Sequence, residues 1–349
     1  MGFFGDFFGK NINNIMTNDM GIDLGTTNTL VYIKGQGVVV NEPSVVCIRK
    51  DNNEVLAIGE KANDMLGRTP ENILAIRPIK EGVITDFEVT QAMVSYFIQK
   101  ASKGVVSPRI IIGVPYGITK VEKKAIEEAA IQAGGREVYV LEEPMAAAIG
   151  AKLNVNDPDG NMIVDIGGGT SEIAVVSLGG IVVARSVRIG GDEFDKAIIN
   201  FIRREYNIDV GEKTAEKIKL LIGSAYPSEV EKEMEVSGKD ILTGLPRIIT
   251  IGSTEIREAL ENPLSEIIEE IKTTLEMTKP ELASDIMANG IYITGGGSLL
   301  KNIDKLISKE TDLKVNIAQN PLECVVEGIG MAVENELIFE SIVKINAES

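Results

Sequence analysis

Short runs of apolar, β-branched residues alternate along this chain with longer stretches in which apolar residues recur at helical spacing. Residues 109–115 (RIIIGVP) form a continuous apolar run, typical of a strand covered on both faces. The next stretch opens with Thr119 and Glu122 in a capping box and ends at Gly134 and Gly135, which predicts a helix. Strands are predicted at 136–141 and 162–166, and helical spacing recurs at 192–206, 212–224 and 264–277. This alternation predicts an α/β fold.

A weak internal repeat divides the chain into two similar halves. Residues 21–40 (GIDLGTTNTLVYIKGQGVVV) and 163–184 (IVDIGGGTSEIAVVSLGGIVVA) share the order strand, loop, strand, turn, strand. In each copy an aspartate, Asp23 or Asp165, stands at the entrance of the first loop. The repeat predicts two lobes of one design, whose loop tips converge on one cleft if the lobes face each other.

The two loop tips have the composition of phosphate-binding loops. Glycines let backbone N–H groups approach an anion closely, and nearby hydroxyls can donate to phosphate oxygens. Asp23 and Asp165 cannot accept a phosphate directly, so we expect them to hold Mg²⁺ through its waters. Taken singly, each tip also fits an ordinary hairpin turn. The candidate loop residues are Gly25, Thr26, Thr27 and Asn28 in the first lobe, and Gly167, Gly168, Gly169, Thr170 and Ser171 in the second.

A third glycine cluster, Gly295 to Gly297, lies between a predicted strand and a predicted helix with Ser298 as its N-cap. Flat glycine backbone there could stack against a purine ring, although a plain strand-to-helix turn has the same pattern. The chain contains neither the G-x-x-x-x-G-K-[ST] motif of P-loops nor G-x-G-x-x-G after a strand. Those two classes of nucleotide site are therefore excluded.

The composition of the chain argues against several other classes of function. The 349-residue chain is too long for one simple core, and its net charge of −17 opposes binding to nucleic acid. It has no histidine, which excludes Ser-His and Cys-His nucleophile pairs and most zinc sites. Its two cysteines, Cys47 and Cys324, are flanked by valines and are expected to be buried thiols in a reducing compartment. Hydrolysis would therefore depend on carboxylates, hydroxyls, backbone amides and a hard metal ion.

The N-terminus is unusually aromatic, with Phe3, Phe4, Phe7 and Phe8 near the start. Phe4, Phe8, Ile12 and Ile15 recur at helical spacing, but the segment lacks the basic start and uninterrupted apolar core of a signal peptide. The pattern fits an amphipathic helix in a bilayer interface, or a terminal helix docked on its own domain.

Several motifs in order carry a family resemblance over nearly the whole chain from about Met20. They include GIDLGTTNTLVY, GVPYGIT, LEEPMAAAIGA, VDIGGGTSEIAVVSLGG, IGGDEFD, GEKTAEKIK, IGSAYP and YITGGGSLL. This set resembles the actin, Hsp70 and sugar-kinase superfamily, and within it is similar to the MreB family of bacterial actins. The resemblance implies an actin-like ATPase fold, with two lobes, each built on a ribonuclease-H-like mixed sheet with flanking helices, and the nucleotide in the interlobe cleft. It divides the chain into domain IA (residues 1–34, 78–150 and 320–349), IB (35–77), IIA (151–187 and 250–319) and IIB (188–249).

The resemblance also implies roles for individual residues toward ATP and Mg²⁺. Asp23 with Gly25 to Asn28 matches the first phosphate loop, and Asp165 with Gly167 to Thr170 matches the second. Gly295, Gly296 and Gly297 match the adenosine motif, with Glu212, Lys213 and Glu216 near the ribose and base. Glu143 matches the catalytic glutamate and Thr170 the water-positioning threonine. On its residues alone, Glu143 also suits a first-turn carboxylate that stabilises its helix. Because nothing resembles a cationic finger or a strong base, we expect slow turnover.

The implied function is that of an ATP-binding and weakly ATP-hydrolysing bacterial actin. Such proteins polymerise into paired protofilaments on the inner face of the cell membrane and determine cell shape, or cell helicity or motility where no wall exists. Expected partners are further copies of the chain, other cytoskeletal or wall-synthesis proteins, and membrane lipid, but not nucleic acid. Lipid contacts are expected from Phe3, Phe4, Phe7 and Phe8 and from a loop tip at Val105 and Val106.

Two monomeric alternatives share the phosphate loops. An Hsp70-like ATPase would need a separate substrate-binding region, and a sugar-kinase-like ATPase would need an acceptor pocket with a carboxylate base. The motifs LEEPMAAAIGA and IGSAYP favour the bacterial actin over the kinase.

Overall fold

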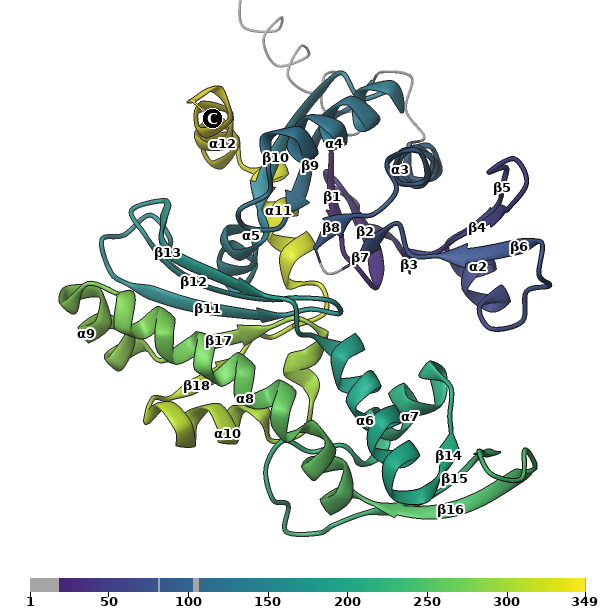
Figure 1. Cartoon of the computed structure of the whole chain (residues 1–349). Helices are drawn as coiled ribbons and strands as arrows, with labels where there is room; N and C mark the ends of the chain where they lie inside the picture. The colour runs from purple at the N-terminus through teal and green to yellow at the C-terminus, as the bar shows by residue number, and fades with distance from the viewer. Residues whose placement is uncertain (1–18, 81, 103–106, 349) are drawn as a thin grey trace, which may run out of the picture. The chain divides into compact units, whose positions relative to one another are not determined.

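The computed structural model describes residues 19–80, 82–102 and 107–348. The chain forms two compact units, one ending at Leu153 and resuming at Glu323, the other running from Asn154 to Leu322. Figure 1 labels the elements of both. The predicted phenylalanine-rich N-terminus and the loop tip at Val105 and Val106 lie outside the described residues. The finer division into four subdomains stays a prediction.

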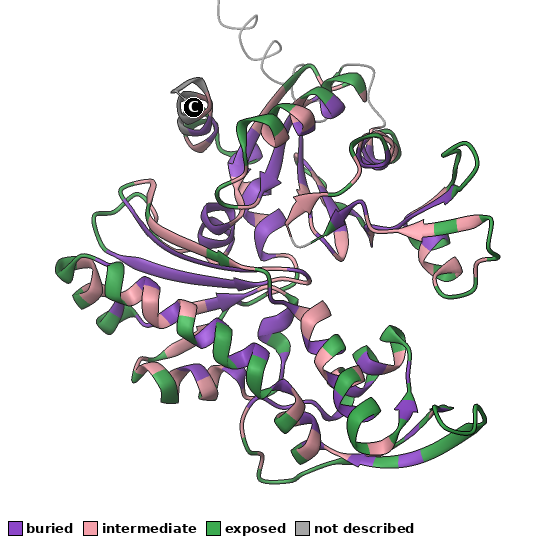
Figure 2. Cartoon of the chain, viewed as in Figure 1, coloured by how far each residue is buried: buried purple, intermediate pink, exposed green. Residues whose placement is uncertain are grey.

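The first unit is built on a five-stranded mixed sheet with the strand order β10-β9-β1-β2-β3. Strands β1, β2 and β3 form an antiparallel meander, whereas β9 and β10 run parallel to β1. Figure 2 shows how consistently the inner strands of this sheet are buried. The bounds are β1 Met20–Leu24, β2 Asn28–Ile33, β3 Gly37–Pro43, β9 Arg109–Val114 and β10 Glu137–Glu142.

Helices cover both faces of this sheet, and the side chains of β1 point alternately to the two faces. Met20, Ile22 and Leu24 belong to one apolar core with residues of α3 (Phe87–Ala101) and α4 (Lys120–Gln132). The opposite face carries Gly21, where a Cβ would lie 2.6 Å from Ile329 of α11 (Cys324–Glu334). Helix α11 also packs closely on α5 (Glu143–Gly150). The predicted capping box of Thr119 and Glu122 is confirmed at the start of α4.

The rest of the first unit consists of smaller elements. The side-chain amide of Asn346 in α12 (Glu336–Glu348) accepts a hydrogen bond from the Val140 N–H and donates one to the Val140 carbonyl oxygen. These two hydrogen bonds cover the outer edge of β10. A small sheet of order β5-β4-β6 carries α2 beside it, and β7 pairs with β8. The bounds are β4 Val46–Arg49, β5 Val55–Ile58, α2 Glu60–Met65, β6 Ile73–Ile76, β7 Ile79–Lys80 and β8 Val83–Ile84.

The second unit repeats this topology, as the sequence predicts. Its main sheet has the order β13-β12-β11-β17-β18, with an antiparallel meander β11-β12-β13 and β17 and β18 parallel to β11. Asp23 pairs with Leu30 and Asp165 pairs with Glu172, one residue before each first strand ends. The bounds are β11 Asn161–Ile166, β12 Ser171–Ser177, β13 Gly180–Val187, β17 Ile291–Thr294 and β18 Val315–Ile317.

Helices α8, α9 and α10 pack on strands of this sheet. Helices α6, α7 and α8 contact a second, three-stranded sheet of order β14-β15-β16. Helix α8 begins at Ser253 and passes through Pro263, so it is longer than the predicted 264–277. Proline removes one helical hydrogen bond, but Ile256, Leu260 and Leu264 form a continuous buried face across it. The bounds are α6 Gly191–Tyr206, β14 Ile208–Asp209, α7 Glu212–Ile222, β15 Glu233–Asp240, β16 Pro246–Gly252, α8 Ser253–Met277, α9 Pro280–Asn289, η1 Gly296–Leu299 and α10 Ile303–Thr311.

Both cysteines are buried, as predicted, Cys47 in β4 and Cys324 at the start of α11. None of the described helices combines the length and the apolar character that crossing a bilayer requires.

Candidate functional site

The first candidate phosphate loop connects β1 to β2 and is held from behind by Ser44. The Ser44 hydroxyl donates to the Gly25 carbonyl oxygen (2.6 Å) and lies within hydrogen-bond distance of the Thr29 hydroxyl (2.9 Å). The backbone N–H of Ser44 donates to the Thr27 carbonyl oxygen (2.8 Å). A Cβ at Gly25 would lie 2.6 Å from the Asn28 carbonyl oxygen, so the turn requires glycine there. Sequence reasoning missed Ser44, because its partners are brought to it only by the pairing of β2 with β3.

The second candidate phosphate loop connects β11 to β12 and is fastened to the start of α6. The Gly167 carbonyl oxygen accepts from Gly191 N–H (3.0 Å), and the Gly168 carbonyl oxygen accepts from Asp192 N–H (2.8 Å). In a trans peptide the N–H points opposite to the C=O of the preceding residue. The N–H groups of Gly168 and Gly169 therefore point away from α6. Backbone amides that point outward from a loop in this way can line an anion site.

Asp165 lies at the mouth of this loop in an environment that suits a bound cation. Its side chain is buried, and Oδ1 has no hydrogen-bond partner within the part of the chain that the structure describes. Burial raises the pKa of Asp165 to about 7. A divalent cation or its waters would satisfy the oxygen and favour the carboxylate, so the residue fits a role toward Mg²⁺.

The glycine cluster after β17 lies directly against the end of β11. Gly295 has φ 79° and ψ 166°, a conformation that essentially only glycine adopts. A Cβ on it would lie 2.3 Å from both Asp165 Oδ1 and the Ile166 carbonyl oxygen, and a Cβ on Gly297 would lie 2.2 Å from Ile166 Cγ2. The structure thus brings the candidate adenosine motif and the second phosphate loop together.

The predicted N-cap role of Ser298 is wrong. The segment after Gly295 forms the 3₁₀ turn η1, and the Ser298 hydroxyl donates back to the Gly295 carbonyl oxygen (2.7 Å). Helix α10 begins later, at Ile303, and follows Asn302. The serine hydroxyl stabilises the glycine turn instead of capping a helix.

The candidate ribose and base contacts Glu212, Lys213 and Glu216 are exposed on the first turns of α7. Lys219, one turn further, donates from Nζ to the Gly191 carbonyl oxygen (2.9 Å) and pairs with Asp195 of α6 (2.9 Å).

This connection links α7 to the element that holds the second loop, and sequence reasoning missed it. The Lys219 and Asp195 side chains are only 14% and 12% exposed, and burial raises the pKa of Asp195 to about 6. Asp195 ends the motif IGGDEFD and Lys219 ends the motif GEKTAEKIK, but neither motif indicates that the two side chains are in contact.

Glu143 is the first residue of α5 and lies beside the ends of β1 and β9. A Cβ on Gly113 would lie 3.7 Å from Glu143 Cγ, and Gly113 pairs with Asp23 across the two strands. The first unit therefore gathers Glu143, Asp23 and the first loop at one end of its sheet. Thr170, the other candidate catalytic residue, belongs to the second unit.

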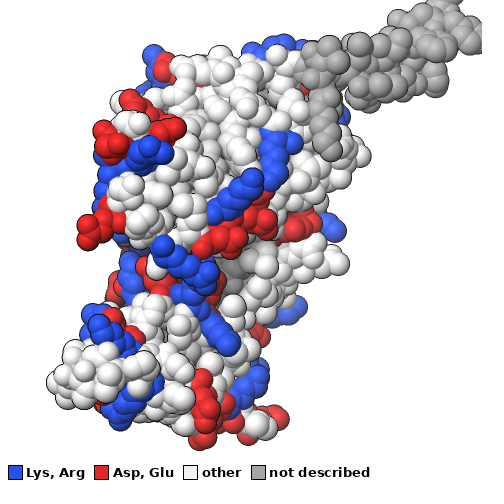
Figure 3. Space-filling view, turned by 90° about the vertical axis from the view of Figure 1, so that its right-hand side faces the viewer, with Lys and Arg blue, Asp and Glu red and all other residues white. Residues whose placement is uncertain are grey.

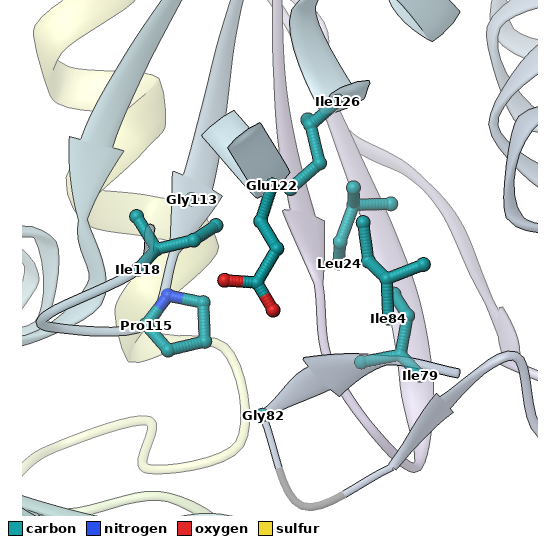
Figure 4. A pocket seen from close by; sticks show the side chains of 9 residues that line it. All are labelled: Leu24, Ile79, Gly82, Ile84, Gly113, Pro115, Ile118, Glu122 and Ile126. Carbon is teal, nitrogen blue, oxygen red and sulfur yellow. The ribbon is translucent and has the colours of Figure 1, made fainter. Parts of the chain in front are cut away.

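A small apolar cavity lies beyond Gly113, at the same end of the sheet (Figure 4). Its volume is about 20 Å³, which is enough for about one water molecule and far too small for a nucleotide. In Figure 4 the Glu122 carboxylate points into the space between Pro115 and Ile79. The capping box explains this polar group, since Glu122 accepts from the Thr119 N–H (3.0 Å).

Charged side chains of both signs are interspersed on the face shown in Figure 3. A nucleic-acid backbone is usually bound by clustered lysines and arginines. On this face, acidic groups interrupt the basic ones.

Comparison with known proteins decides the family. The model of the family described as MreB/Mbl protein matches residues 17–340. The chain belongs to the MreB/Mbl family. Two MreB/Mbl relatives are the cell shape-determining proteins MreB of Escherichia coli K12 and Mbl of Bacillus subtilis 168. The first is 53% identical over 93% of this chain and 96% of the relative, and the second is 50% identical over 92% and 97%.

The fold agrees with solved structures of bacterial actins. MreB5 of Spiroplasma citri, crystallised with ADP, superposes with a TM-score of 0.86 and 41% identity over 95% of this chain and 98% of that one. The same protein has been crystallised with AMPPNP. The expected actin-like fold, with two lobes on mixed sheets, is therefore confirmed for this MreB/Mbl chain.

Proposed function

We propose that this chain is a bacterial actin that binds ATP, hydrolyses it slowly, and polymerises into membrane-associated protofilaments that determine cell shape. The observation that carries the proposal is Asp165, a buried carboxylate whose Oδ1 has no hydrogen-bond partner among the described residues, beside a loop whose glycine amides point away from α6. Nucleotide binding is further supported by the solved MreB5 structures with ADP and AMPPNP. The cell-shape role is supported by the names of the Escherichia coli and Bacillus subtilis relatives.

In this proposal the two phosphate loops hold the phosphates of one nucleotide. The amides of Gly25 to Asn28 and Gly167 to Thr170 donate to phosphate oxygens. Asp23 and Asp165 would hold Mg²⁺ through its waters, and the bound ion would neutralise charge on the phosphates. The glycine turn of Gly295 to Gly297 lies along the adenosine, and Glu212, Lys213 and Glu216 contact its ribose and base.

Hydrolysis then requires an acceptor that orients the attacking water. Glu143 takes this role with Thr170, and its carboxylate is placed in the first turn of α5, at the positive end of that helix. Slow turnover follows because no cationic finger or strong base is assigned to the site. Slow hydrolysis suits a polymer that uses the nucleotide state to time its disassembly.

Membrane attachment is proposed through the apolar N-terminus. Phe3, Phe4, Phe7 and Phe8 supply the apolar contacts, with Val105 and Val106 as a smaller second contact, and hydrophobic docking suits a chain of net charge −17. The filament would lie on the inner face of the cell membrane, with wall-synthesis or other cytoskeletal proteins as partners. Without a wall, the filament itself would shape or move the cell.

Sedimentation tests the proposal directly. Purified protein is incubated with Mg-ATP, with Mg-ADP and without nucleotide, centrifuged at high speed, and its pellets are imaged by electron microscopy. We expect paired filaments favoured by ATP, and a variant lacking residues 2–15 should pellet less with liposomes than the full chain. ATP hydrolysis by a protein that stays monomeric at every concentration would favour the Hsp70-like alternative, and phosphorylation of an added sugar would favour the kinase.

A further inference from the structure

Asn302, between η1 and α10, connects the glycine turn to the loop that follows α7. Its Nδ2 lies within hydrogen-bond distance of the Ser224 hydroxyl (3.1 Å), the Ser228 hydroxyl (3.0 Å) and the Tyr226 carbonyl oxygen (3.2 Å). The neighbouring backbones are joined as well, because Ala225 N–H donates to the Lys301 carbonyl oxygen (2.8 Å). Two segments distant in the sequence are therefore tied at one side chain.

The geometry of this connection is specific to asparagine. The Tyr226 carbonyl oxygen only accepts hydrogen bonds, so the amide nitrogen of Asn302 must face it. Asn302 adopts φ 60° and ψ 20°, a left-handed conformation that asparagine tolerates better than most residues. Ser224 is 1% exposed, so water cannot readily replace a lost partner there.

Both segments lead to the proposed nucleoside contacts. On one side, α7 ends at Ile222, just before Ser224, and carries Glu212, Lys213 and Glu216 on its first turns. On the other side, the Leu300 N–H donates to the Gly297 carbonyl oxygen (3.1 Å), which connects the glycine turn to the start of α10. The Asn302 cluster, which consists of Asn302, Ser224, Tyr226 and Ser228, therefore connects the two segments that carry the proposed nucleoside contacts.

We propose that Asn302 is a positioning residue that holds α7 at a fixed distance from the Gly295–Gly297 turn and thereby sets the geometry of the nucleoside half of the site. This inference rests on the proposed ATP site. The phosphate half has contacts that do not involve α7, since the Gly167 and Gly168 carbonyl oxygens accept from Gly191 and Asp192 at the start of α6. Loss of the Asn302 amide therefore affects nucleotide affinity and leaves the chemical step intact.

The test compares two glycine substitutions at the two ends of α10. Asn302→Gly keeps the left-handed backbone accessible and removes the amide, whereas Asp312→Gly makes the same backbone change at φ 59° outside the Asn302 cluster. For Asn302→Gly we expect the KM for Mg-ATP and the Kd for Mg-AMPPNP to rise about tenfold, with kcat changed by less than about twofold. Asp312→Gly should match the wild type in all three constants.

Ser224→Ala provides a second variant that leaves the backbone unchanged, with its urea midpoint measured to confirm folding. We expect a smaller rise in KM than for Asn302→Gly, because Asn302 keeps Ser228 and Tyr226 as partners. Combined with Asn302→Gly, the rise should stay below the sum of the two effects, because both variants act on the same cluster. A fall in kcat at constant KM, or equal constants for the Asn302 and Asp312 variants, would overturn the inference. Failure of the wild type to bind Mg-AMPPNP would instead overturn the proposed function.

Discussion

The three consecutive glycines after β17 should respond very differently to the same substitution with alanine. Gly295→Ala places a methyl group 2.3 Å from two oxygen atoms and forces alanine into a conformation that only glycine adopts readily. Gly297→Ala overlaps Ile166 Cγ2 at 2.2 Å, without the positive φ. Gly296→Ala meets only Leu322 Cδ2, at 3.2 Å, which is the end of a flexible side chain. We expect severe, intermediate and negligible effects, respectively.

The magnitudes follow from these contacts. For Gly295→Ala, backbone strain of about 1–3 kcal/mol adds to an overlap of about 1–3 kcal/mol, so the free energy of unfolding should fall by about 4 kcal/mol. Gly297→Ala has only the overlap with buried Ile166 and should lose about 2 kcal/mol. Gly296 is exposed, and its alanine variant should stay within about 0.5 kcal/mol of the wild type.

Urea unfolding followed by circular dichroism measures all three variants, and fluorescence anisotropy of a labelled ATP analogue measures binding. Gly296→Ala is the matched control, because it adds the same methyl group to the same turn. The Gly297→Ala cost should shrink in the background Ile166→Ala, where the overlapping Cγ2 is absent. Equal destabilisation by Gly295→Ala and Gly296→Ala would refute the reasoning from these contacts.

Asp165→Asn should stabilise the nucleotide-free protein at pH 8 by up to about 4 kcal/mol, since burial raises the pKa of this carboxyl from 3.8 to about 7 and the folded state disfavours its charge. The stability of the wild type relative to this variant should fall as pH rises from about 4 to about 7. Mg-ATP should no longer raise the melting temperature of the variant. If the nucleotide-free variant melts at a lower temperature than the wild type at pH 8, the expected stabilisation is contradicted. Lys219→Met should cost about 3–5 kcal/mol in urea unfolding because it leaves Asp195 buried without its cation, whereas Lys213→Met, exposed on the same helix, should cost little. Glu143→Gln should slow phosphate release by about 100-fold or more with Mg-ATP affinity unchanged, and hydrolysis at the wild-type rate would remove Glu143 from the mechanism.

The architecture could be predicted largely because its signals are local. The apolar run at 109–115 and the capping box of Thr119 and Glu122 each depend on residues close in sequence. The repeated loops of Asp23 and Asp165 indicated two sheets of the same topology, which the structure contains. Helix α8 escaped full prediction, since the buried face that carries it through Pro263 is a tertiary property.

The sequence by itself determined which residues could bind phosphate, because glycines, hydroxyls and carboxylates are visible as letters at fixed spacing. Only the tertiary structure decided how these residues are held. Ser44 behind the first loop, Lys219 between α7 and α6, and the contact of Gly295 with Asp165 join residues that are far apart in the chain. Such contacts depend on strand pairing and helix packing, so their short distances and the raised pKa of Asp165 appear only when the chain is folded.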